Sequence, residues 1–122
     1  MEEIEVLLDC LRNIDYSQFG DDRIDTLLDC RDCEPFDSEL CRVDSEIARM
    51  KNQYNYTFQS QQDQIRKEAF FIVESNIGSE LADYISDDFG LIFDSIVIGY
   101  KDEWLSKLID TYRNGKIPFG NL

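Results

Sequence analysis

The chain has 122 residues, of which 26 are acidic and 12 are basic, so its formal charge at neutral pH is −14. This length predicts one domain, residues 1–122. The lack of histidine excludes a Ser-His-Asp triad, a Cys-His dyad and a histidine-ligated metal. The excess of carboxylates argues against direct binding to nucleic acid or to an anionic membrane, because both need a basic surface.

Apolar side chains make up 43% of the chain, which is enough to form a buried core. The longest unbroken apolar run, residues 69–73, is too short to cross a bilayer. The first five residues contain no lysine or arginine and do not predict a secretory signal peptide. We therefore expect a cytoplasmic protein with no membrane partner.

Apolar residues recur at helical spacing along most of the chain. The pattern between residues 4 and 11 predicts a first helix, and residues 21–31 form a second. The apolar side of the second helix consists of Ile24, Leu27 and Leu28. Pro35 ends this region, because proline cannot continue a helix in its interior.

The next apolar pattern is unusually long. Its three- and four-residue steps run from Val43 to Ile72, which allows one long central helix ending near Gly78. Residues 52–58 are weak helix formers, so a break there is the alternative.

Three shorter helices are predicted after Gly78, over residues 79–85, 89–98 and 102–113. Residues 96–98 could also form a strand, but a lone strand has no sheet to join. The predicted fold is therefore all-α, a compact bundle of about five to six helices.

Four cysteines lie in the N-terminal third, at positions 10, 30, 33 and 41. Cys30 and Cys33 have the spacing of a zinc-ligand pair, but Cys10 and Cys41 do not form a second pair. Acidic neighbours also oppose thiolate formation. We expect ordinary buried or half-buried thiols, with no metal and no other cofactor.

The predicted second helix carries a row of carboxylates that we call the acidic stripe: Asp22, Asp25, Asp29 and Asp32. Steps of three, four and three residues place them on one helix face. Like charges at this spacing destabilise a helix by a few tenths of a kcal/mol per pair. The stripe is therefore a candidate binding surface for a basic partner, and a merely solvated face is the alternative.

A second candidate surface follows in residues 84–89. Tyr84, Asp87 and Asp88 combine an aromatic ring with adjacent carboxylates, a composition suited to contact with a basic protein.

Two short motifs raise an enzyme alternative. Glu34-x-x-Asp37 and Glu80-x-x-Asp83 each match half of the acidic motif of Mg²⁺-dependent all-α nucleotide pyrophosphohydrolases. No helix supplies the other half, a Glu-Glu-x-x-Glu sequence. We expect a protein that is not an enzyme, with the hydrolase as one alternative.

The chain resembles bacterial toxin-immunity proteins in its small size, its acidity and its helical character, and in the sequence of residues 87–92 and 99–105. Such proteins include those of contact-dependent inhibition systems and of colicin-type toxins, and the resemblance covers about the last third of the chain. It implies a non-catalytic protein that binds a cognate basic toxin domain, an RNase or a DNase. The acidic stripe, with Asp87 and Asp88, would then occlude the toxin's basic cleft.

A nucleic-acid mimic that inhibits DNA-binding enzymes shares the charge argument and is the other alternative. It requires carboxylates along an extended surface, whereas residues 47–82 contain four acidic and four basic side chains. The sequence therefore favours the immunity protein.

Overall fold

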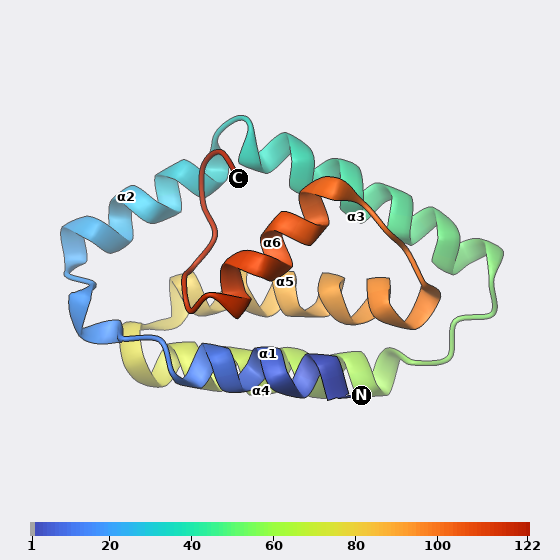
Figure 1. Cartoon of the computed structure of the whole chain (residues 1–122), viewed down its shortest axis with the longest axis horizontal. Helices are drawn as coiled ribbons and strands as arrows, with labels where there is room; N and C mark the ends of the chain where they lie inside the picture. Colours follow the sequence, from blue (N-terminus) through green and yellow to red (C-terminus); the bar gives the residue numbers. More distant parts are fainter. Residues whose placement is uncertain (1) are drawn as a thin grey trace.

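The computed structural model describes residues 2–122, which form six α-helices and one short 3-10 helix (Figure 1). The α-helices are α1 (Glu2–Arg12), α2 (Asp21–Asp32), α3 (Phe36–Gln53), α4 (Gln59–Ile77), α5 (Ser79–Ile98) and α6 (Glu103–Arg113). No strand occurs in this part of the chain, so the all-α prediction is confirmed. Within residues 2–122, no helix combines the length and the apolar character needed to span a bilayer.

Helix α5 is the centre of the fold. It packs against α4 and α3, and in Figure 1 it lies between the α1–α4 edge and the α2–α3 edge. Four of its large apolar residues expose at most 1% of their surface: Leu81, Ile85, Phe89 and Ile92. Burial of this size stabilises by roughly 1.5–3 kcal/mol per large apolar side chain.

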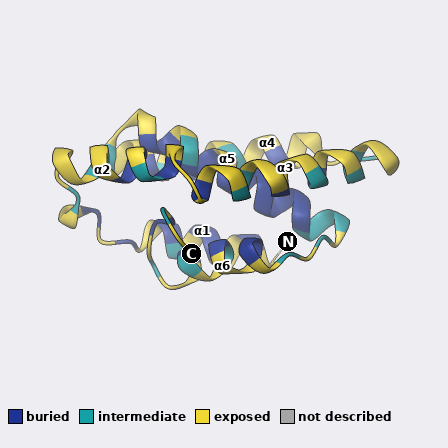
Figure 2. Ribbon diagram, turned by 90° about the horizontal axis from the view of Figure 1, so that it is seen from above, coloured by how far each residue is buried: buried dark blue, intermediate teal, exposed yellow. Residues whose placement is uncertain are grey.

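Helices α1 and α6 form a second layer over this centre (Figure 2). The apolar face predicted for α1 is confirmed, because its four large apolar residues expose at most 1%: Ile4, Leu7, Leu8 and Leu11. The Tyr112 ring of α6 meets the Phe89 ring of α5 edge-on, with 5.0 Å between centroids. This aromatic pair joins the two layers.

The prediction of one long central helix is wrong, and the alternative, a break within residues 52–58, is confirmed. Helix α3 ends at Gln53 and α4 begins at Gln59. The break lets α3 and α4 pack on α5 separately, and Asp94 of α5 holds the turn in place. Asp94 accepts hydrogen bonds from Lys51 Nζ at 2.9 Å and from Gln62 Nε2 at 2.6 Å.

The prediction of separate helices over 79–85 and 89–98 is also wrong, because α5 is continuous. The residues between the two predicted segments continue the helix: Ser86 and Asp88 are buried in the native packing, whereas Asp87 is exposed. A Cβ on Gly90 would lie 2.8 Å from Cδ of Arg66, so glycine here gives room to a neighbouring side chain. Helix α5 ends at Gly99, whose φ of 74° is the left-handed conformation that favours glycine.

Candidate partner-binding site

The acidic stripe lies on the solvent side of α2. All four of its aspartates are exposed. On the other side of the helix Leu27 and Leu28 are buried and Ile24 is half-buried, so the predicted division into two faces is confirmed. The first turn of α2 holds Asp21 and Asp22, where the helix dipole stabilises negative charge.

No ion pair neutralises the acidic stripe. Within residues 2–122, none of its carboxylates lies within 4.0 Å of a lysine or arginine nitrogen. Elsewhere in the fold most cations have acidic partners, as Arg12, Arg42 and Arg66 do. The stripe therefore carries, on the exposed face of α2, four carboxylates without an ion-pair partner in the described part of the chain.

A groove of about 670 Å³ runs between α2 and the first turns of α5. Its lining includes five carboxylates: Asp25, Asp29, Asp32, Glu80 and Asp83. The Tyr84 hydroxyl donates a hydrogen bond to Oδ1 of Asp32 at 2.6 Å and so bridges the two helices. This hydrogen bond raises the pKa of Tyr84, because a phenolate would face a carboxylate. We call this feature the acidic groove.

Glu80 and Asp83 are the groove residues that sequence reasoning did not assign to a binding surface. Asp83 follows Glu80 by three residues and Tyr84 comes next, so the helical spacing places all three near one edge of α5. In the sequence, Glu80 and Asp83 match only half of a hydrolase motif. Nowhere in residues 2–122 do three carboxylate or thiol side chains come close enough to hold a metal ion.

Asp87 lies on a different face from the acidic groove. Its side chain is exposed and pairs with Arg66 of α4. It lines a separate groove formed by α3, α4 and α5. The structure therefore does not bring Asp87 together with the acidic stripe.

Asp88 is not a surface residue, and its assignment to a binding surface is corrected. Its side chain is fully buried. Arg31 donates from Nη2 to Oδ1 at 2.6 Å and from Nη1 to Oδ2 at 2.9 Å, while the Tyr112 hydroxyl donates to Oδ2 at 2.5 Å. Adjacent residues on a helix point about 100° apart, so Asp87 faces solvent while Asp88 faces the core.

Arg31 is the positioning residue that sequence reasoning missed. It exposes only 2% of its surface, and Nη1 also donates to the backbone oxygen of Pro118 at 3.0 Å. Its guanidinium carbon lies 4.5 Å from the centre of the Phe36 ring. Arg31 therefore ties α2 to α5, to Phe36 of α3 and to the chain after α6. The sequence did contain an indication of this burial, because Arg31 follows Leu27 by four residues and Leu28 by three and therefore lies on the apolar face of the helix.

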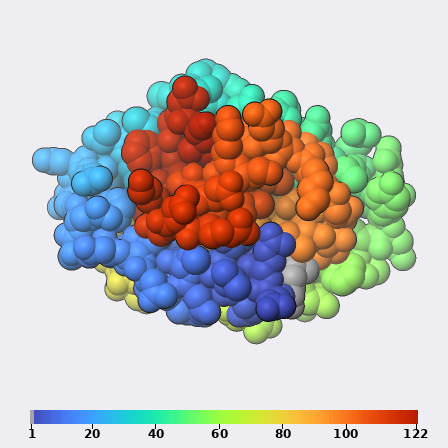
Figure 3. Space-filling model, in the orientation of Figure 1, coloured from blue at the N-terminus to red at the C-terminus, as the bar shows by residue number. Residues whose placement is uncertain are grey.

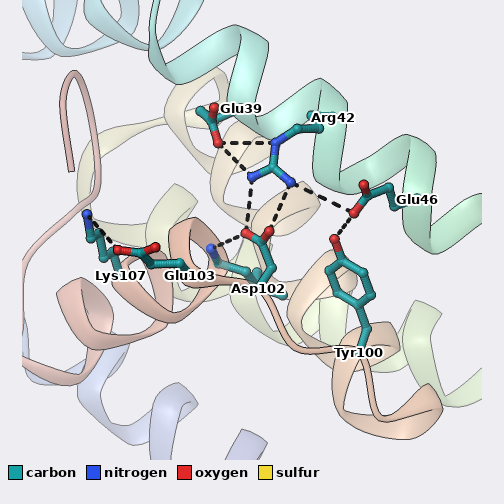
Figure 4. Close-up of polar contacts among 8 residues, drawn as sticks. Glu39, Arg42, Glu46, Tyr100, Asp102, Glu103 and Lys107 are labelled. Atoms are coloured by element: carbon teal, nitrogen blue, oxygen red, sulfur yellow. Dashed lines mark hydrogen bonds and ion pairs between the residues drawn. The ribbon is translucent and has the colours of Figure 1, made fainter.

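The corner between α3 and α6 shows what neutralised carboxylates look like in this fold (Figure 4). Arg42 donates to Asp102 at 2.9 Å and to Glu39 at 2.7 Å. Asp102 also caps α6 by accepting the backbone N–H of Leu105 at 2.9 Å. The hydrogen bond from Arg42 is the main cause that lowers the pKa of Asp102. This corner has its own cation and does not extend the acidic stripe.

The cysteines divide into two groups. Cys10 and Cys30 are half-buried, as predicted, whereas Cys33 and Cys41 are exposed, which was not predicted. Both exposed thiols lie on the outward sides of the α2–α3 region, where the apolar core does not reach.

Comparison with known proteins now defines the family. A family model described as Immunity protein PIM1 matches residues 3–119. The chain belongs to this immunity protein family. The match includes the acidic stripe, both walls of the acidic groove and the Arg31–Asp88 pair. No curated protein and no solved structure matches the chain.

Membership confirms the resemblance to immunity proteins. Such proteins are typically non-enzymatic inhibitors, and each has a cognate toxin as its partner. Membership of this family therefore favours the interpretation as an immunity protein over the two alternatives, a nucleotide hydrolase and a nucleic-acid mimic.

Proposed function

We propose that this immunity protein neutralises a nuclease toxin by covering the toxin's basic substrate cleft with the acidic stripe and the acidic groove. The observation that carries the proposal is the absence, among residues 2–122, of any ion pair to the stripe. A cleft that binds RNA or DNA presents lysines and arginines to phosphates, and unpaired carboxylates suit the same groups. Under this proposal the protein acts in the cytoplasm, where such a toxin meets its substrate.

The charge of the chain supports fast association as well as recognition. A net charge of −14 attracts a basic domain over distances comparable with the Debye length, about 8 Å at physiological salt. Electrostatic steering of this kind raises association rates by about 10- to 1000-fold. Tyr84 stands at the wall of the acidic groove and offers an aromatic contact beside the carboxylates. Aromatic residues of this kind often dominate interface energies.

The partner can be identified by affinity capture from nuclease-treated lysate of the source cells, washed at rising salt. We expect one basic toxin domain that stays bound at high salt, and nucleic-acid cleavage by that domain that this protein suppresses. A toxin with a substrate other than nucleic acid would refute the nuclease assignment. Recovery of several DNA-binding enzymes that dissociate with salt would instead indicate a nucleic-acid mimic.

The binding face can be tested with two variants that have the same net charge but carry the reversed charges at different places. Asp25→Lys with Asp29→Lys reverses two charges of the stripe, whereas Asp44→Lys with Glu74→Lys makes the same change at exposed carboxylates elsewhere that have no ion pair within residues 2–122. Stopped-flow association with the captured toxin should slow at least about 10-fold more for the stripe variant at low salt. The difference should shrink as salt rises. Equal rates for the two variants would show that the stripe is only a solubility feature.

A further inference from the structure

A third groove, of about 560 Å³, lies on the other side of α2 from the acidic groove, against the C-terminal segment (residues 114–122). Figure 3 shows this segment, in dark red, packed against the blue and cyan atoms of α2 and its neighbours. Phe19, Leu27 and Ile117 contribute apolar surface to it, and Phe119 leaves 46% of its own surface exposed. We call this feature the tail groove.

The charge of the tail groove is opposite to that of the rest of the molecule. Its lining includes Arg23 and Lys116 and, among the described residues, no acidic side chain. Neither cation has a carboxylate within 4.0 Å in residues 2–122. Arg23 lies over the Phe19 ring instead, 5.5 Å from its centroid. In a chain of net charge −14, an apolar groove with two unpaired cations selects for an anion.

We infer that the tail groove receives an apolar side chain of the toxin that has a carboxylate beside it, and that this contact selects the cognate toxin. The inference rests on the proposed function, because it concerns the same partner. Helix α2 contributes to both grooves, Asp25 and Asp29 to one and Arg23 and Leu27 to the other. One toxin surface that covers α2 therefore meets the acidic groove along one flank of the helix and the cationic apolar groove along the other.

The two grooves do different work in this arrangement. Any basic nuclease is attracted to the acidic stripe, so the stripe alone discriminates poorly between toxins. A basic nuclease that places a cation, and not a carboxylate, against Arg23 and Lys116 would be repelled. Pockets that bind small ligands typically have volumes of about 300–1,000 Å³, and the tail groove lies within this range.

The chemistry of the tail groove can be tested directly with a blocked peptide in which one phenylalanine stands between two aspartates. In ¹H–¹⁵N NMR titration of the full chain, we expect saturable shifts confined to Arg23, Thr26 and the 114–119 region. The same peptide with lysines in place of aspartates should leave these signals unchanged. Shifts that do not localise to the tail groove, or equal shifts from both peptides, would overturn the inference.

Charge reversal gives a matched comparison. Arg23→Glu with Lys116→Glu should weaken binding of the aspartate peptide about 5-fold or more, as expected from two lost surface ion pairs. Arg49→Glu with Lys101→Glu makes the same change at exposed cations that also lack an ion-pair partner within residues 2–122, and it should leave binding unchanged. Equal weakening in both would show a long-range effect only. Tighter binding of decanoate than of the peptide would assign the groove to a free amphiphile and overturn the toxin segment.

The captured toxin separates this inference from the proposed function. We expect the Arg23→Glu, Lys116→Glu variant to dissociate at least 5-fold faster, while the stripe variant mainly associates more slowly. If the Arg23→Glu, Lys116→Glu variant dissociates at the wild-type rate while the stripe variant associates more slowly, only the inference about the tail groove is refuted. A stripe variant that behaves like its control would refute the proposed function, whatever the tail groove does.

Discussion

The buried pair of Arg31 and Asp88 provides the sharpest test of how this fold presents the acidic stripe. Asp88→Asn keeps the shape of the side chain but removes its negative charge. The asparagine amide would then place N–H groups against the Arg31 guanidinium, donor facing donor, inside the core. Arg31 exposes 1% of its side chain and cannot turn to water without moving α2.

The expected cost follows from the contacts that are lost. Asp88 accepts two hydrogen bonds from Arg31 and one from Tyr112, and each hydrogen bond to a charged group contributes about 1.5–3 kcal/mol. These contributions are not additive. Breaking one partner of a buried ion pair typically costs about 3–5 kcal/mol. Since a domain of this size is stable by about 5–15 kcal/mol, the variant should lose a large part of its stability.

Urea unfolding followed by circular dichroism and by Trp104 fluorescence measures this loss. Asp87→Asn is the matched control, because the neighbouring residue has the same chemistry but forms an exposed pair with Arg66. That control should cost less than about 1 kcal/mol. Replacing both buried partners, with Arg31→Met and Asp88→Leu, should recover much of the loss, because no charge is then left unpaired in the core.

Equal costs for Asp88→Asn and Asp87→Asn would refute the reasoning. Such a result would mean that Arg31 reaches water in the native state and does not set the position of α2. A double replacement as unstable as Asp88→Asn would also contradict it, because the loss would then come from packing and not from an unpaired charge.

Three further outcomes are expected from local features. Gly99→Ala should lower the free energy of unfolding by about 1 kcal/mol in urea titration, because φ at this helix end is 74°, and an unchanged value would contradict the left-handed cap. Asp102→Asn keeps a capping side chain but removes the ion pair with Arg42. Because the pKa of Asp102 is lowered in the native state, its ion pair stabilises the fold above about pH 4. This stabilisation disappears as the pH falls through the lowered pKa. The stability gap between wild type and Asp102→Asn should therefore be larger at about pH 7 than at about pH 2, and a constant gap would exclude this linkage. In an ultraviolet titration of the tyrosines, Tyr16 should ionise only near pH 12, because burial raises its pKa to about 12. Burial also raises the pKa of Tyr112 well above its usual value, so Tyr112 should ionise only with unfolding. Full ionisation of both by about pH 11 in the folded protein would contradict their burial.

Periodicity alone was sufficient for much of the fold. The apolar faces of α1 and α2 and the outward direction of the acidic stripe follow from steps of three and four residues. The all-α class follows for the same reason, because such spacing is satisfied only by a helix. The resemblance to immunity proteins also came from the sequence, through small size, acidity and two short segments. Whether the stripe binds the toxin remains a prediction.

The tertiary structure decided what periodicity cannot report, which is the partners that meet on each face. Arg31 and Asp88 are 57 residues apart, and no local pattern shows that a charge on α2 will find its counter-charge inside α5. For the same reason the sequence predicted two helices where α5 is continuous, and it placed Asp88 on the surface. The acidic groove and the tail groove likewise join segments distant in sequence. Spacing determines the direction of a side chain from its own helix, whereas burial, pairing and grooves depend on which other helices arrive there.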